Sequence, residues 1–151
     1  MKVLKKARHF FLFDTKTKIL LIEAFFFLGW ARILKSIPFS KVATSLGEYM
    51  NETPLSMDET NRKVFQNISN SINIMSRNTF WESKCLVKAI AAMKMLERRH
   101  VESTIYLGVS KDEEGNMVAH AWLRSGSFYI TGEEGMEGFM VVGKFAKRIN
   151  F

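Results

Sequence analysis

The chain has 151 residues, of which 47% are apolar and 25% charged, and its formal net charge is +7; this composition suits one domain with a buried core and excludes global disorder. Its only cysteine, Cys85, excludes an internal disulfide and a zinc site built on paired cysteines, and its three histidines are too scattered for a ligand cluster, so we expect no metal and no cofactor. The basic residues crowd both ends without a nucleic-acid motif, so we interpret them as a solvated surface and expect no nucleic acid, with an acidic peptide or an anionic membrane as alternative partners.

The first predicted element is a helix over residues 15–36, which Pro38 ends. It is apolar around much of its circumference, so it should be largely buried. Its apolar run over 19–31 has only 13 residues and contains Glu23, whereas a bilayer span needs about 20 apolar residues. No small-residue cleavage site follows, so a secretory signal is not indicated. We interpret this segment as a buried or interface helix, with peripheral membrane contact as the minor alternative.

Two more helices and a loop complete the predicted helical half. A short helix over 39–46 is closed by a glycine, and a loop follows over 48–57. A long helix should begin near residues 56–58, because Ser56 and Glu59 have the spacing of a capping box. Its apolar residues recur at helical spacing and should form one buried face. They are Val64, Phe65, Ile68, Ile72 and Met75.

The second half begins with a helix over 83–99 and then changes to a period of two residues, which predicts strands. The predicted strands cover 103–110, 117–124, 127–131 and 139–146, the last being either a strand or a final packed segment. Helices followed by a meander of antiparallel strands indicate the α+β class.

Cys85 lies in the first turn of the helix over 83–99. The free N–H groups and the positive dipole end of a helix stabilise a thiolate there, and they can also bind the oxyanion of a tetrahedral intermediate. The neighbouring Lys84 adds positive potential. A buried apolar filler is the alternative interpretation of a single cysteine.

His120 lies in the middle of a predicted strand, between two alanines. Alternation places His120, Trp122 and Arg124 on one face of that strand. A histidine on a strand that packs across a helix N-terminus can reach a thiol there and serve as general base and acid. A hydrogen-bonded core histidine is the alternative.

Four sequence blocks together resemble the transglutaminase-like, papain-like leader peptidases of lasso-peptide biosynthesis. They are WESKCLVKA over 81–89, MLERR over 95–99, IYLGV over 105–109 and AHAWL over 119–123. The resemblance covers roughly residues 77–145. It implies one domain over 1–151, with a helical part over 1–76, and a catalytic helix with an antiparallel sheet over 77–151.

The resemblance also implies an activity and its partners. Such an enzyme cuts the leader from a ribosomally made lasso precursor through a cysteine thioester, here with Cys85 as nucleophile and His120 as general base and acid. The expected partners are the precursor, a separate small protein that holds the leader and, as a further candidate, the ATP-dependent cyclase. A lone cysteine fits the cytoplasm, where we expect the protein, without membrane contact. Acyl transfer to an amine, or a non-catalytic partner of the cyclase, are the alternatives.

The group that orients His120 is the point at which this sequence departs from the family. The family places an aspartate near the end of the following strand, and this chain has none there. Glu133 is the favoured replacement because it is the nearest charged acceptor, with Thr131, a backbone carbonyl or a simple dyad as alternatives. Candidate substrate-binding residues are Trp81, Ser83, Trp122 and Arg77.

Overall fold

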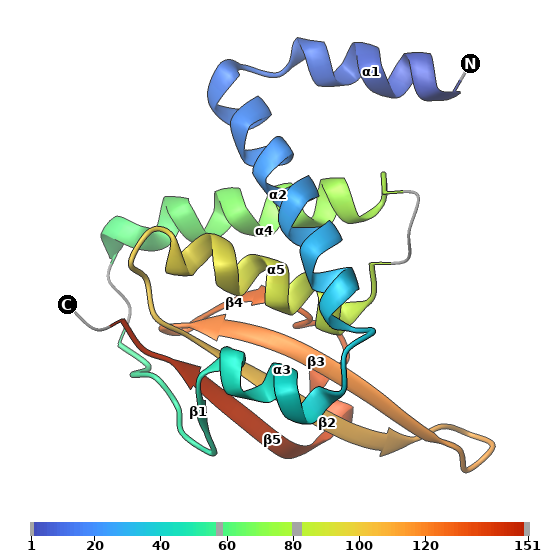
Figure 1. Ribbon diagram of the computed structural model, residues 1–151, viewed down its shortest axis with the longest axis vertical. Helices are drawn as coiled ribbons and strands as arrows, with labels where there is room; N and C mark the ends of the chain where they lie inside the picture. Colours follow the sequence, from blue (N-terminus) through green and yellow to red (C-terminus); the bar gives the residue numbers. More distant parts are fainter. Residues whose placement is uncertain (1, 57–58, 80–82, 150–151) are drawn as a thin grey trace.

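The structure is a computed structural model that describes residues 2–56, 59–79 and 83–149. In these residues five α-helices lie with a five-stranded antiparallel sheet, which confirms the α+β class (Figure 1). The helices are α1 (Lys2–Leu12), α2 (Thr15–Leu34), α3 (Phe39–Leu46), α4 (Arg62–Ser76) and α5 (Cys85–Glu97). The strands are β1 (Glu48–Tyr49), β2 (Ser103–Lys111), β3 (Met117–Ser125), β4 (Phe128–Thr131) and β5 (Met140–Lys147). Two 3₁₀ turns lie at Glu59–Asn61 and Met136–Gly138.

The sheet is not a simple meander, although the strand positions agree with the sequence prediction. Its order is β1-β5-β2-β3-β4, so the chain leaves β4 at one side and crosses to the far side of β2 before it forms β5. The two-residue strand β1 pairs with β5 inside a segment that the sequence predicts as loop, and that prediction was wrong at 48–49. Gly47 makes this pairing possible, since its φ of 124° suits glycine and a Cβ would collide with the Ala146 carbonyl.

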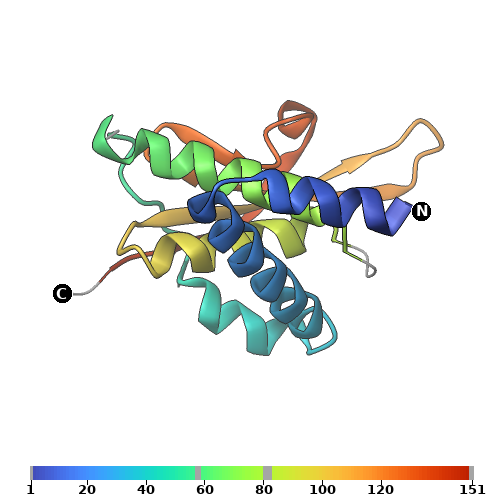
Figure 2. The same ribbon diagram turned by 90° about the horizontal axis from the view of Figure 1, so that it is seen from above.

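The helices and the sheet enclose one core, with α5 at its centre (Figures 1 and 2). α5 packs on α2 and α4 above it and on β2, β3 and β4 below it. Its small residues Ala89, Ala91 and Ala92 have no exposed surface, which lets these neighbours approach closely. The predicted stripe of α4 is confirmed, because Phe65, Ile68 and Ile72 are buried.

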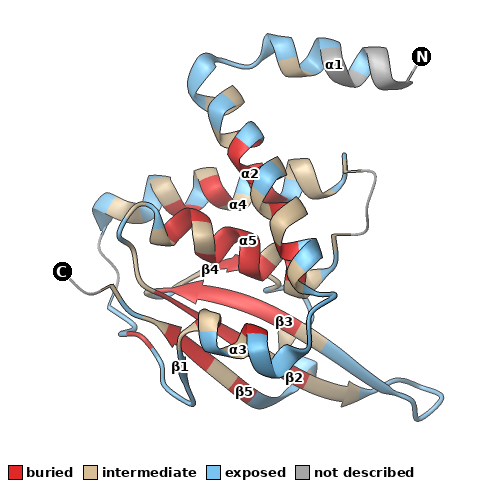
Figure 3. Ribbon diagram, in the orientation of Figure 1, coloured by how far each residue is buried: buried red, intermediate tan, exposed pale blue. Residues whose placement is uncertain are grey.

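Two predictions for the helices were wrong. α2 ends before Pro38 as expected, and its N-cap is Asp14. However, only one side of α2 is buried, while the opposite side is exposed (Figure 3). α4 begins at Arg62 after a 3₁₀ turn, and its N-cap, Asn61, makes no side-chain cap bond, so Ser56 does not start this helix. A further helix, α1, precedes α2 where the sequence indicates only positive charge.

Glu23 fastens α2 to the end of α5. Its carboxylate accepts two hydrogen bonds of 2.8 Å from the Arg99 guanidinium, and it forms an ion pair of 3.0 Å with Arg98. The Glu23 side chain is only 7% exposed, so its charge is compensated at a buried position. The hydrogen bond with Glu23 raises the pKa of Arg99, against the effect of burial. The single acid in the apolar run of α2 is therefore a structural anchor.

Candidate active site

Cys85 is the first residue of α5. The preceding Lys84 is extended and its side chain provides no cap hydrogen bond. The backbone ladder of the helix begins with the Lys88 N–H donating to the Lys84 carbonyl at 3.0 Å, so the N–H groups of residues 85–87 precede the ladder. The Cys85 side chain is half-buried, and it lies at the positive end of the helix dipole.

His120 lies on β3 beyond the part of this strand that pairs with β4. β3 pairs with β2 along its length, with His120 opposite Gly108, but β4 pairs only with Leu123, Arg124 and Ser125. β4 then ends at Thr131 and the chain turns at Gly132. His120 therefore lies where the sheet opens at its edge, and its ring is half-buried.

Both residues line one cavity of about 380 Å³ between α4, the start of α5 and the end of β4. Arg77, Thr131 and Glu133, which the sequence also singled out, line it too. The remaining lining residues come from the same elements and from the turn after β4: Ser69, Asn73, Lys88, Tyr129, Ile130, Gly132 and Glu134. The Ser69 hydroxyl donates to the Ile130 carbonyl at 2.8 Å and fastens α4 to β4 beside this cavity.

The cysteine and the histidine share the cavity without a hydrogen bond between them in the described part of the chain. Hydrogen bonds between a nucleophile and its base are often long before substrate binds, and they shorten in the complex. The arrangement thus brings together a helix N-terminus, a thiol and an imidazole, which are the groups that acyl transfer through a thioester requires.

The His120 ring is held by a backbone carbonyl. Its Nε2 lies 2.7 Å from the Gly132 oxygen, and since a carbonyl only accepts, Nε2 must carry the proton. In the neutral ring Nδ1 is then the basic nitrogen. Among the described residues Thr131 Oγ1 is buried without a hydrogen-bond partner, and Glu133 is exposed. The geometry favours the carbonyl among the predicted alternatives, and the orienting role of Glu133 stays a prediction.

Gly132 can fill this position because it is a glycine. Its φ is 74°, in the left-handed region, and a Cβ there would come 2.5 Å from the Ala121 carbonyl oxygen. The turn therefore brings its carbonyl back to His120, one residue before Ala121 on β3. Sequence alone carries only a weak signal for this contact, a glycine directly after a strand.

The charges around the cavity are divided between its two sides. Arg77 follows α4 and Lys88 lies on α5, so the helical side is basic. Glu133 and Glu134 lie on the turn after β4, so the opposite side is acidic. The cavity therefore has opposite charges on its two sides.

A row of aromatic rings packs against His120. The His120 ring lies 5.1 Å from Phe139 and 5.6 Å from Trp122, measured between centroids. Trp122 in turn stacks on Tyr106 at 5.6 Å, with the two planes only 10° apart. Trp122 is 5% exposed, so it supports the imidazole as a buried side chain, and it does not belong to the cavity lining.

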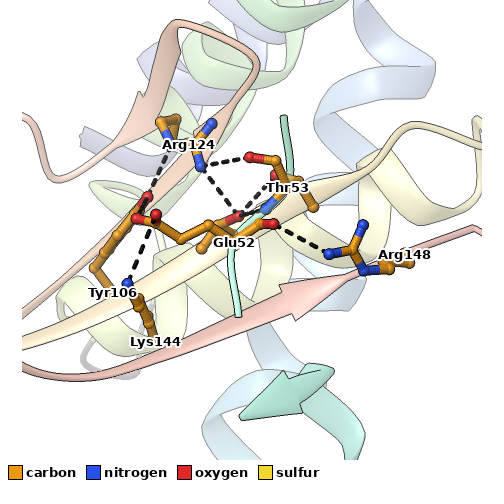
Figure 4. Close-up of polar contacts among 7 residues, drawn as sticks. Glu52, Thr53, Tyr106, Arg124, Lys144 and Arg148 are labelled. Atoms are coloured by element: carbon orange, nitrogen blue, oxygen red, sulfur yellow. Dashed lines mark hydrogen bonds and ion pairs between the residues drawn. The ribbon is translucent and has the colours of Figure 1, made fainter. Parts of the chain in front are cut away.

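The row ends in a buried polar network around Arg124 (Figure 4). Arg124 is 2% exposed and donates to the hydroxyl of Tyr106 and to the backbone carbonyls of Thr53, Pro54 and Gly126. Tyr106 donates to Glu52 at 2.7 Å, and burial together with this bond raises the pKa of the phenol from 10.0 to about 12. The same hydrogen bond lowers the pKa of Glu52.

The other predicted substrate-binding residues are less informative. Trp81 lies outside the described residues. Ser83 is half-buried, and its hydroxyl shares a hydrogen bond of 3.1 Å with Thr79. Within the described residues no group of three or more histidine, cysteine, aspartate or glutamate side chains is placed to hold a metal ion.

The structure thus places a cysteine at the start of a helix and a histidine of the antiparallel sheet in one cavity. The sequence matches the Transglutaminase-like superfamily over residues 25–144, so the chain belongs to that superfamily. The match begins within α2 and includes α3, α4 and the cavity, so it reaches into the helical half of the chain. Comparisons with curated proteins and with solved structures gave no match. Membership indicates cysteine peptidase or transglutaminase chemistry.

Proposed function

We propose that the protein is a cysteine peptidase that removes the leader from a lasso-peptide precursor, with Cys85 as nucleophile and His120 as general base and acid. The observation that carries the proposal is that these two residues, far apart in sequence, line one cavity at the start of α5. The superfamily supports the chemistry. The sequence blocks around Cys85 and His120 support the substrate.

The site suits both the acylation of Cys85 and the hydrolysis of the resulting thioester. The Cys85 sulfur attacks the scissile carbonyl carbon, and His120 Nδ1 takes the thiol proton and passes it to the leaving amine as the C–N bond breaks. The N–H groups at the start of α5 bind the oxyanion meanwhile. Water then attacks the thioester, a C–O bond replaces the C–S bond, and His120 returns a proton from the water to the sulfur.

Mass spectrometry of a lasso precursor incubated with this protein and its leader-recognition protein tests the proposal. We expect leader and core fragments with the wild-type protein and none with Cys85→Ala or His120→Ala. His9→Ala is the matched control, because His9 is exposed and lies outside the cavity, and it should cleave like the wild type. Cleavage that persists in Cys85→Ala would overturn the assignment.

Acyl transfer by the same thioester is distinguished in the same assay. When a primary amine is added, hydrolysis leaves a free carboxylate on the leader, whereas transfer leaves the leader joined to the amine. A leader that carries the amine as the main product would make the protein a transferase. A wild-type protein that leaves every precursor intact would count against the substrate, even if Cys85 reacts with thiol reagents.

A further inference from the structure

One side of α2 exposes a row of large apolar side chains, opposite to the side that the core buries. The four residues lie at helical spacing and form what we name the outer stripe: Ile19, Ile22, Phe26 and Ile33. They are 46–68% exposed, whereas Leu21, Ala24 and Leu28 on the inner side are at most 1% exposed. At 1.5 Å per residue the stripe is about 21 Å long. A surface helix that packs only on the core of its own domain usually has polar residues on the side opposite to that core.

The outer stripe continues into the corner between α1 and α2. Phe11 and Leu12 are 72% and 75% exposed, and Phe13 is 37% exposed. Figure 1 shows that α1 and the first turns of α2 stand out from the body of the molecule. Phe11 and Leu12 therefore lie on a projecting surface. Phe13, which is less exposed, also lines a cavity of about 280 Å³ between α1, α2 and α4.

The positive charge of the protein is concentrated in the same part of the chain. Residues 1–41 contain nine lysines and arginines against two acids, Asp14 and Glu23, while the rest of the chain contains thirteen of each sign. The whole net charge of +7 therefore belongs to this segment. Glu23 is turned inward to Arg98 and Arg99, which leaves the outer side more basic still.

Lysines also flank the outer stripe itself. Lys16 is exposed and Lys18 is half-buried, and at 100° per residue they fall on opposite sides of the stripe. Lys18 Nζ lies 5.6 Å from the Phe11 ring centroid, so charge and apolar surface are adjacent at the corner. Exposed apolar side chains beside lysines on one side of a helix are the combination that binds the surface of an anionic membrane.

We propose that the outer stripe of α2, together with the corner at Phe11–Phe13, is a docking surface for an anionic lipid membrane. The apolar side chains would enter the boundary between headgroups and acyl chains, and the lysines would contact the lipid phosphates. No helix in the described residues is long and apolar enough to span a bilayer, so the contact is a surface contact. It differs from the expectation of no membrane contact, and it does not depend on the peptidase proposal.

Vesicle flotation tests the surface, with the full chain and two vesicle compositions. We expect binding to vesicles of equal parts phosphatidylcholine and phosphatidylglycerol, weak binding to phosphatidylcholine alone, and release at high salt. Lys16→Gln with Lys18→Gln should lower the partition coefficient about 25-fold, at about fivefold per lysine. Ile22→Ser with Phe26→Ser should reduce it further, without a change in the unfolding temperature, because both side chains are exposed.

The matched control is Met140→Ser with Val142→Ser, which removes two exposed apolar side chains of the sheet. It should bind vesicles like the wild type, and so should Cys85→Ala. Equal binding to neutral and anionic vesicles, or binding that Ile22→Ser with Phe26→Ser leaves intact, would overturn the proposal. A third result would also overturn it: a wild-type protein that binds no vesicles and sediments as a dimer, which Ile22→Ser with Phe26→Ser converts to a monomer. The surface would then join two copies of the chain.

Discussion

The hydrogen bond between His120 and Gly132 fixes which nitrogen of the ring is basic. Because the carbonyl can only accept, Nε2 keeps its proton and Nδ1 is free to take one from the thiol. A carbonyl carries no net charge, so it orients the ring without the full negative charge that an aspartate would supply to an imidazolium.

This geometry predicts that the side chains at 131 and 133 are dispensable. Glu133→Gln and Thr131→Val should each retain most of the activity, because neither side chain bonds the ring in the described structure. Precursor cleavage measures the effect, and Lys88→Met gives a comparison for a change of charge within the same cavity. A loss in Glu133→Gln comparable to that in His120→Ala would instead make Glu133 the orienting group.

Gly132→Ala should lower both stability and activity. The new Cβ would meet the Ala121 carbonyl at 2.5 Å in a left-handed backbone, so we expect a loss of about 1–3 kcal/mol in the free energy of unfolding. Urea denaturation measures it. Gly115→Ala is the matched control, because Gly115 also has a positive φ but its Cβ would meet open space.

The raised pKa of Tyr106 predicts that the folded protein loses stability at alkaline pH. Its pKa is about 12 in the folded chain and near 10 when unfolded, so the folded state favours the protonated phenol. The stability that the raised pKa of Tyr106 provides is fully present below pH 10 and is lost as the pH rises to about 12. The loss in the free energy of unfolding is at most about 2–3 kcal/mol. Tyr106→Phe should lack this part of the pH dependence, which the difference between the two unfolding curves isolates.

Glu23 fastens α2 to the C-terminal end of α5. Arg99 makes two hydrogen bonds to this carboxylate and is 31% exposed, whereas Arg98 makes a single ion pair and is 63% exposed. An exposed pair contributes little, because solvent screens it. We therefore expect Arg99 to contribute more to stability than Arg98.

Arg99→Gln should cost about 2 kcal/mol of unfolding free energy, since it leaves the buried Glu23 poorly compensated. Arg98→Gln should cost less than about 1 kcal/mol. Urea denaturation of the two variants measures both. Equal costs would show that Glu23 is reached by solvent more freely than its 7% exposure indicates.

At the scale of the whole molecule, α5 fills the space between two layers. Ala92 on this helix has no exposed surface, so Ala92→Leu should overpack the core and cost about 1–3 kcal/mol. Thr44→Leu, at an exposed position of α3, is the control and should be nearly neutral. The unfolding temperature measures the difference.

The sequence predicted those parts of the fold that depend on local pattern. The periodicities of α4, β2 and β3 placed these elements to within a few residues, except where a 3₁₀ turn delayed the start of α4. The sequence did not predict the two-residue strand β1 or the crossing from β4 to β5, because both depend on pairing across the sheet. The sequence also placed Cys85 and His120 on elements that share a cavity, although their catalytic roles stay a proposal.

The bond from Gly132 to His120 also bears on how this site can change by mutation. A carboxylate that orients a histidine is lost with a single substitution of its side chain, but a backbone carbonyl is present whatever residue occupies the position. What the contact requires is the backbone conformation of the turn, and a glycine at position 132 permits that conformation. An alanine scan of the polar side chains would therefore pass over the group that holds His120. Only replacement of the peptide bond, as in an ester analogue of the backbone, would weaken the acceptor itself.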